Sequence, residues 1–406
     1  MRDLDLFQMA LGLVEPWYVE RSEFNPAARR LDLYLNFKSG GVFACPECGG
    51  GGCKAYDTTE KTWRHLNFFH HEAYLHARVP RVKCERCGVK LVDVPWARTG
   101  SGFTLMFEAI VLMLVKAMPV AEAARMLGEH DTRLWRVVHH YVDEARESRD
   151  LSEVRAVGVD ETASKRGHQY ITLFVDLEQS RLLFATEGRD ARTMSAFRSD
   201  LEKHGASAEQ VKEVCADLSP AFRKGLREEF PHARITFDKF HIMKLLNEAV
   251  DQVRREEQKS RPELKGTRYL WIKNPLSLSS AQIDQYDRLY LPSLNLKTAR
   301  AYHLKLGFQD LWQQPKARAE AFLKAWYNWA IRSQLDPIKR FARTIRDHWQ
   351  GVLNWFQTRI SNGILEGMNS LIQAAKAKAR GYRSTRNLIA IAYLIAGKLD
   401  LRPLPI

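Results

Sequence analysis

Two Cys-x-x-Cys pairs near the start of the chain constrain its fold more than any other feature. Cys45 and Cys48 form the first pair, and Cys84 and Cys87 form the second. Two tight turns that each present two thiolates match the tetrahedral coordination that zinc prefers. We therefore predict a zinc site closed by four protein ligands, which stabilises the fold and does not catalyse.

The residues around these pairs favour a zinc-ribbon domain over residues 1–100. Residues 31–43 and 72–83 alternate apolar and polar side chains, as half-buried strands do, and each run leads into a Cys-x-x-Cys turn. Other side chains compete for the metal, so a mixed cysteine and histidine site stays open. The competitors are Cys53, His65, His70, His71 and His76.

Residues 101–150 are predicted to form a helix-turn-helix domain. The apolar periodicity predicts helices over residues 105–117, 120–127 and 133–147. Gly128 lies in the turn before the third helix, and Arg133 and Arg136 stand at the start of that helix, where a recognition helix contacts DNA. The alternative is an amphipathic core helix whose arginines are simply solvated.

Over residues 154–237 the pattern of apolar side chains changes from the periodicity of helices to that of strands. Three strand-like runs are followed by alternating helices and strands, which predicts a mixed α/β sheet. Asp160 ends the first predicted strand and Asp217 follows the fourth. Carboxylates in such places are costly when buried alone and favour binding of Mg²⁺ or Mn²⁺. Glu161 competes with Asp160 as the ligand.

Glu366 is the third candidate ligand of this cation. It is the only acidic residue between Asp347 and Asp400, and it lies in a helix predicted over residues 361–380. Together the three carboxylates indicate a two-metal site for phosphoryl transfer. The basic residues expected to contact DNA from this part of the chain are Lys376, Lys378, Arg380 and Arg383.

The charge distribution points to a polyanionic partner. The chain of 406 residues has a net charge of +14, and residues 261–406 carry 24 Lys and Arg against nine Asp and Glu. Such an excess favours a nucleic acid as the partner, and the alternative is a basic surface without such a partner. Since we find neither an apolar run long enough to cross a membrane nor a secretory signal, we expect a cytoplasmic, nucleoid-associated protein without a membrane partner.

In this order, the motifs resemble those of the DDE transposases of bacterial insertion sequences, most closely the ISL-three family. The resemblance covers nearly the full length and rests on the segments CPEC, CERCG, VGVDE, ADLS, FDKFH and SNGILEGMNSLIQAAKAKARGYRS, with the helix-turn-helix between the second and third. It implies a multidomain protein with an α/β RNase H-like catalytic core over residues 151–239 and 358–406. An all-α insertion over residues 240–357 would interrupt this core.

The resemblance also implies roles for single residues. Asp160, Asp217 and Glu366 would form the catalytic triad that holds magnesium, while Asp238 and His241 match a motif whose histidine approaches the scissile phosphate. The implied function is binding of terminal inverted repeats, followed by DNA cleavage and strand transfer, by a homodimer or a higher oligomer. Two alternatives stay open: a zinc and helix-turn-helix regulator without catalysis, and an RNase H-like nuclease that recognises DNA structure.

Overall fold

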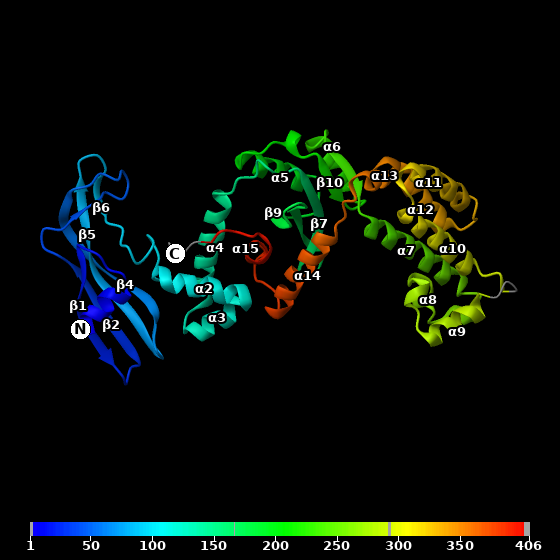
Figure 1. The fold of residues 1–406 in the computed structure, drawn as a ribbon. Helices are drawn as coiled ribbons and strands as arrows, with labels where there is room; N and C mark the ends of the chain where they lie inside the picture. The colour runs from blue at the N-terminus through cyan, green and yellow to red at the C-terminus, as the bar shows by residue number, and fades with distance from the viewer. Residues whose placement is uncertain (1–2, 166, 291–293, 402–406) are drawn as a thin grey trace. The chain divides into compact units, whose positions relative to one another are not determined.

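The structure is a computed structural model with two compact units (Figure 1). It describes residues 3–165, 167–290 and 294–401. The first unit comprises Met1–Arg146 with Leu399–Ile406, and the second comprises Glu147–Lys398. Within the described ranges, no helix is long and apolar enough to cross a membrane.

The first unit contains a six-stranded sheet with the order β1-β2-β5-β4-β3 and with β6 paired to β5. Its strands are β1 (Trp17–Asn25), β2 (Arg30–Phe37), β3 (Val42–Phe43), β4 (Cys53–Phe68), β5 (His71–Cys84) and β6 (Gly88–Leu91). The hairpin of β4 and β5 is antiparallel, whereas β2 runs parallel to β5 on its other side. Helix α1 (Asp3–Ala10) packs against β1.

Strands β1 and β4 extend this sheet well beyond the strands that the sequence predicted. The first ten residues of β4 bury no side chain, and the first buried one is Trp63, so this strand has no amphipathic pattern of its own. Its conformation is set by its pairing with β5, which runs from Ala55 opposite Val82 to Phe68 opposite His71. Cross-strand pairing therefore decides a strand that side-chain periodicity cannot reveal.

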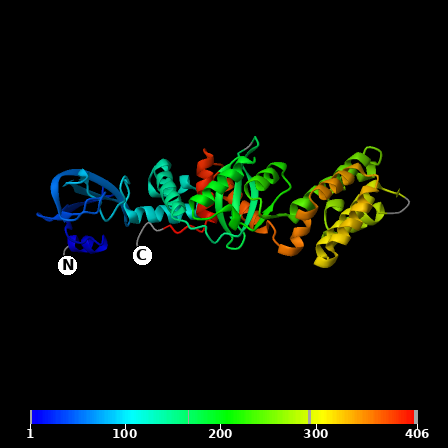
Figure 2. The same ribbon diagram turned by 90° about the horizontal axis from the view of Figure 1, so that it is seen from above.

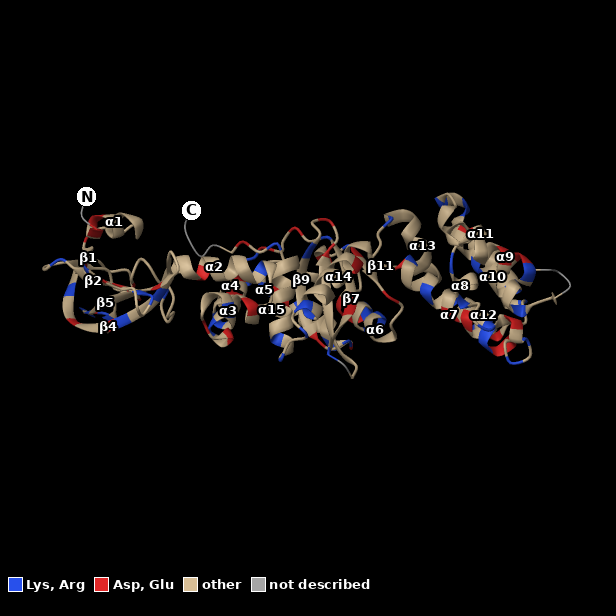
Figure 3. Ribbon diagram, turned by 90° about the horizontal axis from the view of Figure 1, so that it is seen from below, with Lys and Arg blue, Asp and Glu red and all other residues tan. Residues whose placement is uncertain are grey.

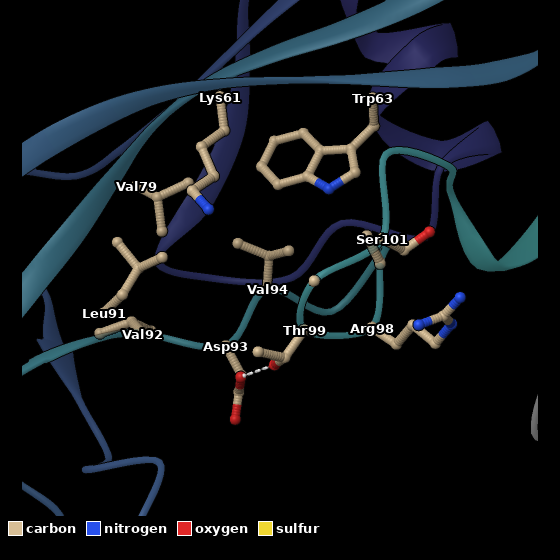
Figure 4. Close-up of a pocket in the computed structure, with 12 residues that line it drawn as sticks. Lys61, Trp63, Val79, Leu91, Val92, Asp93, Val94, Arg98, Thr99 and Ser101 are labelled. Atoms are coloured by element: carbon tan, nitrogen blue, oxygen red, sulfur yellow. Dashed lines mark hydrogen bonds between the residues drawn. The ribbon is translucent and has the colours of Figure 1, made fainter. Parts of the chain in front are cut away.

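The segment after β6 folds back over this sheet and encloses a small pocket (Figure 4). Trp63, Val79 and Val94 supply much of its apolar lining. The Thr99 hydroxyl donates a hydrogen bond to the Asp93 carboxylate at 2.5 Å, which closes the loop on itself. The apolar lining indicates packing between the segment and the sheet.

Three helices complete the first unit, as the sequence predicted. They are α2 (Leu105–Ala117), α3 (Val120–Leu127) and α4 (Asp131–Glu147). The Thr104 side chain caps α2 by accepting from the Phe107 amide, and Gly128 ends α3 in the left-handed conformation at φ 68°. Helix α4 begins at Asp131, two residues before the predicted start, and buries Leu134, Val138 and four other side chains along one face.

A five-stranded mixed sheet with the order β11-β10-β7-β8-β9 forms the centre of the second unit. Its strands are β7 (Ala156–Lys165), β8 (Gln169–Asp176), β9 (Arg181–Glu187), β10 (Glu213–Ala216) and β11 (Arg234–Phe237). Strands β7, β8 and β9 are antiparallel, whereas β10 and β11 run parallel to β7. Helices α5 (Arg192–Lys203) and α6 (Pro220–Glu229) connect these strands and share their core through Phe197 and Phe222.

A helical segment with its own hydrophobic core follows the sheet (Figures 1 and 2). Its helices are α7 (Lys239–Glu257), α8 (Arg268–Ile272), α9 (Ser280–Leu289), α10 (Lys297–Gln309), α11 (Lys316–Ile331), α12 (Asp336–Asp347) and α13 (Trp349–Thr358). Although residues 262–300 include Pro262, Pro275 and Pro292, they contain the helices α8 and α9. Trp326 packs on Phe308 with ring centroids 4.6 Å apart, as expected of a core aromatic.

The chain then returns to the sheet through α14 (Gly363–Lys378) and α15 (Thr385–Ala396). Helix α14 contacts β7, and α15 contacts β9, so both lie beside strands about 200 residues earlier in the sequence (Figure 1). The Tyr393 hydroxyl accepts a hydrogen bond from the Ala185 amide at 3.0 Å, which fixes α15 on β9. Gly158 allows α14 to approach β7, since a Cβ there would lie 2.3 Å from the Leu365 side chain.

Candidate catalytic and DNA-binding sites

Asp160 lies in the middle of β7, paired with Leu173 of β8. The expectation that it ends its strand was wrong, because β8 continues to pair with β7 as far as Lys165. On the other side of β7, however, the pairing with β10 ends where Cys215 meets Gly158. Asp217 follows two residues after Cys215, so the register places it level with Asp160.

The Asp160 carboxylate is almost fully buried, with 6% of the residue exposed. One oxygen accepts from the Glu161 amide at 2.8 Å, and the other accepts from the Asn369 side-chain amide at 2.8 Å. Burial raises the pKa of Asp160 to about 6, and the charges of Asp217 and Glu161 also raise it. A nearby positive charge would stabilise the ionised form of this buried carboxyl group.

Asp238 and His241 form a hydrogen-bonded pair at the start of α7. Asp238 is fully buried, and its Oδ2 accepts from the His241 amide at 3.2 Å and lies 3.1 Å from the ring Nδ1. Its Oδ1 accepts from the Asn362 amide, so Asp238 also fixes the start of α14. The hydrogen bond with Asp238 raises the pKa of His241, and the charges of Asp160 and Asp217 raise it further. His241 therefore stands among the acidic residues of this edge.

Helix α14 runs along β7 through a series of polar contacts. Asn362 donates to the Val159 carbonyl at 3.3 Å, and Gln373 donates to the Thr162 hydroxyl at 2.8 Å. Together with Asn369, these residues follow the spacing of one helical face. Glu366 occupies the same face, between Asn362 and Asn369, and its carboxylate is exposed. The helix thus brings Glu366 to the strand that carries Asp160.

The chemistry of this edge fits a divalent cation of the magnesium type. Asp160, Asp217 and Glu366 supply hard oxygen donors. The side-chain oxygens of Asn362 and Asn369 are buried and have no hydrogen-bond partner in the described structure, so they add two unused acceptors beside Asp160. Among the described residues, only the four cysteines form a group of three or more ligand atoms that lie within 4.8 Å of one another. The three carboxylates are therefore more widely spaced than the cysteines.

The four predicted zinc ligands come together in the first unit. The Sγ atoms of Cys45, Cys48, Cys84 and Cys87 all lie within 4.8 Å of one another. The distance between Cys48 and Cys84 is 3.7 Å, close to the roughly 3.8 Å expected between thiolates around one zinc ion. Hydrogen bonds, first from the Gly50 backbone and then from Cys84, lower the pKa of Cys48 to about 6, whereas the hydrogen bond with Cys48 raises the pKa of Cys87 to about 12, because the neighbouring thiols titrate together.

The competing zinc ligands lie elsewhere. His65 makes a 2.9 Å hydrogen bond with Thr104, and His76 contacts Asp32 at 2.6 Å. His70 and His71 occupy the tip of the β4–β5 hairpin, whereas the cysteines lie at its opposite end. Cys53 contacts the Gly50 carbonyl and is not a member of the cluster.

The two arginines of the helix-turn-helix differ in their surroundings. Arg133 forms an ion pair with Glu129, donates to the Gly102 carbonyl at 3.3 Å and lies over the Phe103 ring at 4.1 Å. These contacts tie the start of α4 to the residues before α2. Arg136, one turn later, is exposed.

The basic residues near the end of α14 differ in a similar way. Lys376 is half-buried and donates to the Ala163 carbonyl at 2.7 Å, so it holds α14 on β7. Arg380 and Arg383 are exposed after the helix ends, and the Arg383 carbonyl accepts from Lys165 at 2.8 Å. Lys378, in the last turn of the helix, is also exposed.

Comparison with known families agrees with this arrangement. A family model described as a transposase matches residues 157–392, and the helix-turn-helix domain of transposase family ISL3 matches residues 92–142. The zinc finger of the transposases of IS204, IS1001, IS1096 and IS1165 matches residues 41–87. Since the first match spans more than half of the chain, it defines the class: the protein is a DNA transposase.

More narrowly, the chain belongs to the ISL3 family of insertion-sequence transposases. It is 28% identical to the transposase for insertion sequence element IS1557 of Mycobacterium tuberculosis, over 99% of this chain and 98% of the relative. It is also 28% identical to the transposase for IS1001 of Bordetella parapertussis, over 92% and 94%. The transposase match covers the second unit, which the alternative of a purely regulatory protein left unexplained.

Proposed function

We propose that this transposase cuts and joins DNA at the ends of its insertion sequence by a two-metal-ion mechanism. The catalytic core would be RNase H-like, formed by residues 151–239 and 358–406 and interrupted by the helical insertion 240–357. The observation that carries the proposal is the packing of α14 along β7: Asn369 of the helix donates a hydrogen bond to Asp160 of the strand, and Glu366 lies one helical turn before Asn369. Such convergence of acidic residues from distant segments is typical of a catalytic site.

Three carboxylates would hold the cations: Asp160, Asp217 and Glu366. Bound Mg²⁺ or Mn²⁺ supplies activation of the attacking water or 3′-hydroxyl and stabilisation of the leaving oxygen. Asn369 restricts the Asp160 side chain to one orientation. The low polarity around Asp160 favours its neutral form unless positive charge is nearby, so the site is tuned to bind a cation.

His241 would act on the DNA phosphate. Its Nδ1 is directed to Asp238, which leaves Nε2 available to the substrate. Because the pKa of His241 is raised, the protonated ring is favoured and can donate to a phosphate oxygen. Asp238 acts through His241 and through the start of α14, so it is a positioning residue in this mechanism.

The first unit would recognise the terminal inverted repeats. Arg136 is exposed on α4 and has the place of a residue that reaches DNA, while Arg133 would orient the helix. The basic residues at the end of α14 and just after it would contact the phosphate backbone: Lys376, Lys378, Arg380 and Arg383. Because two ends must be held together for transposition, the protein would act as a homodimer or a higher oligomer on DNA.

The test is an excision assay with the native element ends. Asp160→Asn, Asp217→Asn and Glu366→Gln should each abolish excision while binding of the ends is retained. Glu161→Gln is the matched control, since it removes a neighbouring carboxylate that the mechanism does not use. Full excision by any of the three variants would contradict the proposed triad.

A structure-specific nuclease is the remaining alternative. It would use the same carboxylates but would not join the cleaved strand to a second DNA. Formation of a covalent joint with a labelled target duplex therefore separates the two functions. A wild-type protein that cleaves and never joins would be a nuclease.

A further inference from the structure

A basic hollow of about 420 Å³ lies along the edge strand of the second unit's sheet. It is bounded by α6, by β11 and by the junction of α12 with α13. Its charged and titratable lining residues are Arg223, Arg227, Arg234, Arg346, Asp347 and His348. Figure 3 shows the basic residues of α6 in blue. None of these residues has a role in the mechanism described above.

The hollow carries an excess of positive charge. Four arginines and one aspartate line it. Arg234 is paired with Glu213 at 3.2 Å, and Arg346 is paired with Asp347 at 3.0 Å. Arg223 and Arg227 form no ion pair with a carboxylate in the described part of the chain.

Arg223 is the most unusual of these groups. Its Nη1 lies 2.7 Å from Nε2 of His348, and its Nε is buried without a hydrogen-bond partner in the described residues. Burial, followed by the charge of Arg223, lowers the pKa of His348, so the imidazole is neutral near pH 7 and supplies no negative charge to the guanidinium. Asp347 acts on Arg223 through its charge but is itself paired with Arg346. A partly desolvated cation without an ion-pair partner is costly, and a bound anion would reduce that cost.

The opposite wall of the hollow is held rigidly in place. Gly351 lets α13 pack directly on β11, since a Cβ there would lie 2.4 Å from the Phe237 ring. Asn354 donates to the Ile235 carbonyl at 2.8 Å and thereby uses a backbone acceptor of the edge strand. The arginines therefore face a preformed surface, which lowers the entropic cost of binding.

We propose that this hollow binds a backbone phosphate of the DNA on which the transposase acts. Arginine suits this role because its planar fork can donate two hydrogen bonds to one phosphate. The location also fits. Strand β11 neighbours β10, which Asp217 follows directly, and α6 begins at Pro220, three residues after Asp217. The assignment of DNA rests on the proposed function, whereas the anion site rests on the geometry alone.

The test compares DNA binding of three variants with that of the wild type. These are Arg227→Gln, the double variant Arg223→Gln/Arg227→Gln, and the control Lys203→Gln/Lys224→Gln, which removes two charges from α5 and α6 outside the hollow. For an element-end duplex, the double variant should weaken binding about tenfold and reduce the slope of log K against log salt by about 1. Arg227→Gln should weaken it about threefold on the same grounds, and the control should change little.

Cleavage of saturating DNA separates this proposal from the proposed function. The hollow variants should cut bound DNA at close to the wild-type rate, whereas Asp160→Asn should bind DNA normally and fail to cut it. Cutting by Asp160→Asn would overturn the catalytic proposal and leave the binding result intact. Because Arg227 is exposed, Arg227→Gln gives an answer even if loss of Arg223 impairs folding.

Three results would overturn the proposal. The first is unchanged affinity and salt slope in Arg227→Gln and, if it folds, in the double variant. The second is an equal loss in the lysine control, which would show a general charge effect. The third is that inorganic phosphate raises the melting temperature only when Arg223 and Arg227 are present, whereas DNA affinity is the same with and without them. This result would assign the hollow to a free anion.

Discussion

The side-chain amide of Asn369 donates a 2.8 Å hydrogen bond to Asp160, although 209 residues separate them in the sequence. This contact connects the helix that carries Glu366 to the strand that carries Asp160. Asn369 presents its amide nitrogen to the carboxylate, and its side-chain oxygen has no hydrogen-bond partner among the described residues. Through this hydrogen bond, helix α14 holds the carboxylate of Asp160, which we propose to be catalytic, in one orientation.

Replacing Asn369 with alanine should slow DNA cleavage about 10- to 100-fold, because partners that orient metal-binding side chains contribute on this scale. Binding of element ends should be unchanged, since Asn369 has no contact role in that step. Single-turnover cleavage at saturating DNA measures the effect. Ser370→Ala, an exposed neighbour on the same helix, is the control. Equal rates for the two variants would show that the hydrogen bond is dispensable.

The raised pKa of Asp160 predicts a pH-dependent stability difference between wild type and Asp160→Asn. Burial raises this pKa from 3.8 to about 6, so the native state favours the neutral acid. The associated stability is present below pH 3.8 and is lost as the pH rises to about 6. In magnesium-free buffer, Asp160→Asn should therefore become more stable than wild type as the pH rises, by roughly 2–3 kcal/mol above pH 6.

Thermal unfolding of the second unit between pH 5 and pH 8 measures this difference, without chelators that would also remove zinc. The gap in melting temperature between the two proteins should widen from pH 5 to about pH 6 and then stay constant. Added Mg²⁺ should stabilise wild type more than Asp160→Asn. A gap that does not change with pH would contradict an elevated pKa.

The four-cysteine cluster predicts about one zinc ion per chain. Cys84→Ser should lower the zinc content severalfold and weaken binding of element ends, because the metal would link the turn after β3 to the end of β5. Cys53→Ser should keep the full zinc content, since Cys53 lies outside the cluster. Metal analysis of the purified proteins decides this, and equal loss of zinc in both variants would place Cys53 among the ligands.

The two arginines of α4 should respond differently to alanine. Arg136→Ala should weaken binding of element ends by about 1–3 kcal/mol, roughly tenfold or more, at an unchanged melting temperature. Arg133→Ala should lower the melting temperature of the first unit, because it removes the Glu129 ion pair and the contact with Phe103. If Arg133→Ala instead leaves stability intact and weakens binding more, Arg133 is the residue that contacts DNA.

Close packing of α14 on β7 predicts that Gly158→Ala is destabilising. The added Cβ would lie 2.3 Å from Leu365 and 2.8 Å from Leu177, and overpacking of this kind costs about 1–3 kcal/mol. Gly367→Ala is the control on α14, because nothing lies within 4 Å of its Cβ and alanine favours the helix. The free energy of unfolding of Gly367→Ala should exceed that of the wild type by up to about 1 kcal/mol. Wild-type stability of Gly158→Ala would show that the helix can shift away.

Much of this architecture follows from local patterns. The spacing of Cys45, Cys48, Cys84 and Cys87 predicted the cluster, because two residues between cysteines suffice for one turn to present both thiolates. The helices α2, α3 and α4 follow from apolar periodicity and from the glycine that ends α3. Such features depend on residues within one or two turns of each other, so the linear sequence carries them.

Other features depend on contacts between distant segments. Strand β4 exists because β5 pairs with it, and Asp160 lies inside β7 because β8 continues beyond it. The hydrogen bond from Asn369 to Asp160 and the contact of Arg223 with His348 have no signature in the sequence. Burial and hydrogen bonding across 100 to 200 residues arise only when the chain has folded, because partner choice depends on which surfaces tertiary packing brings together.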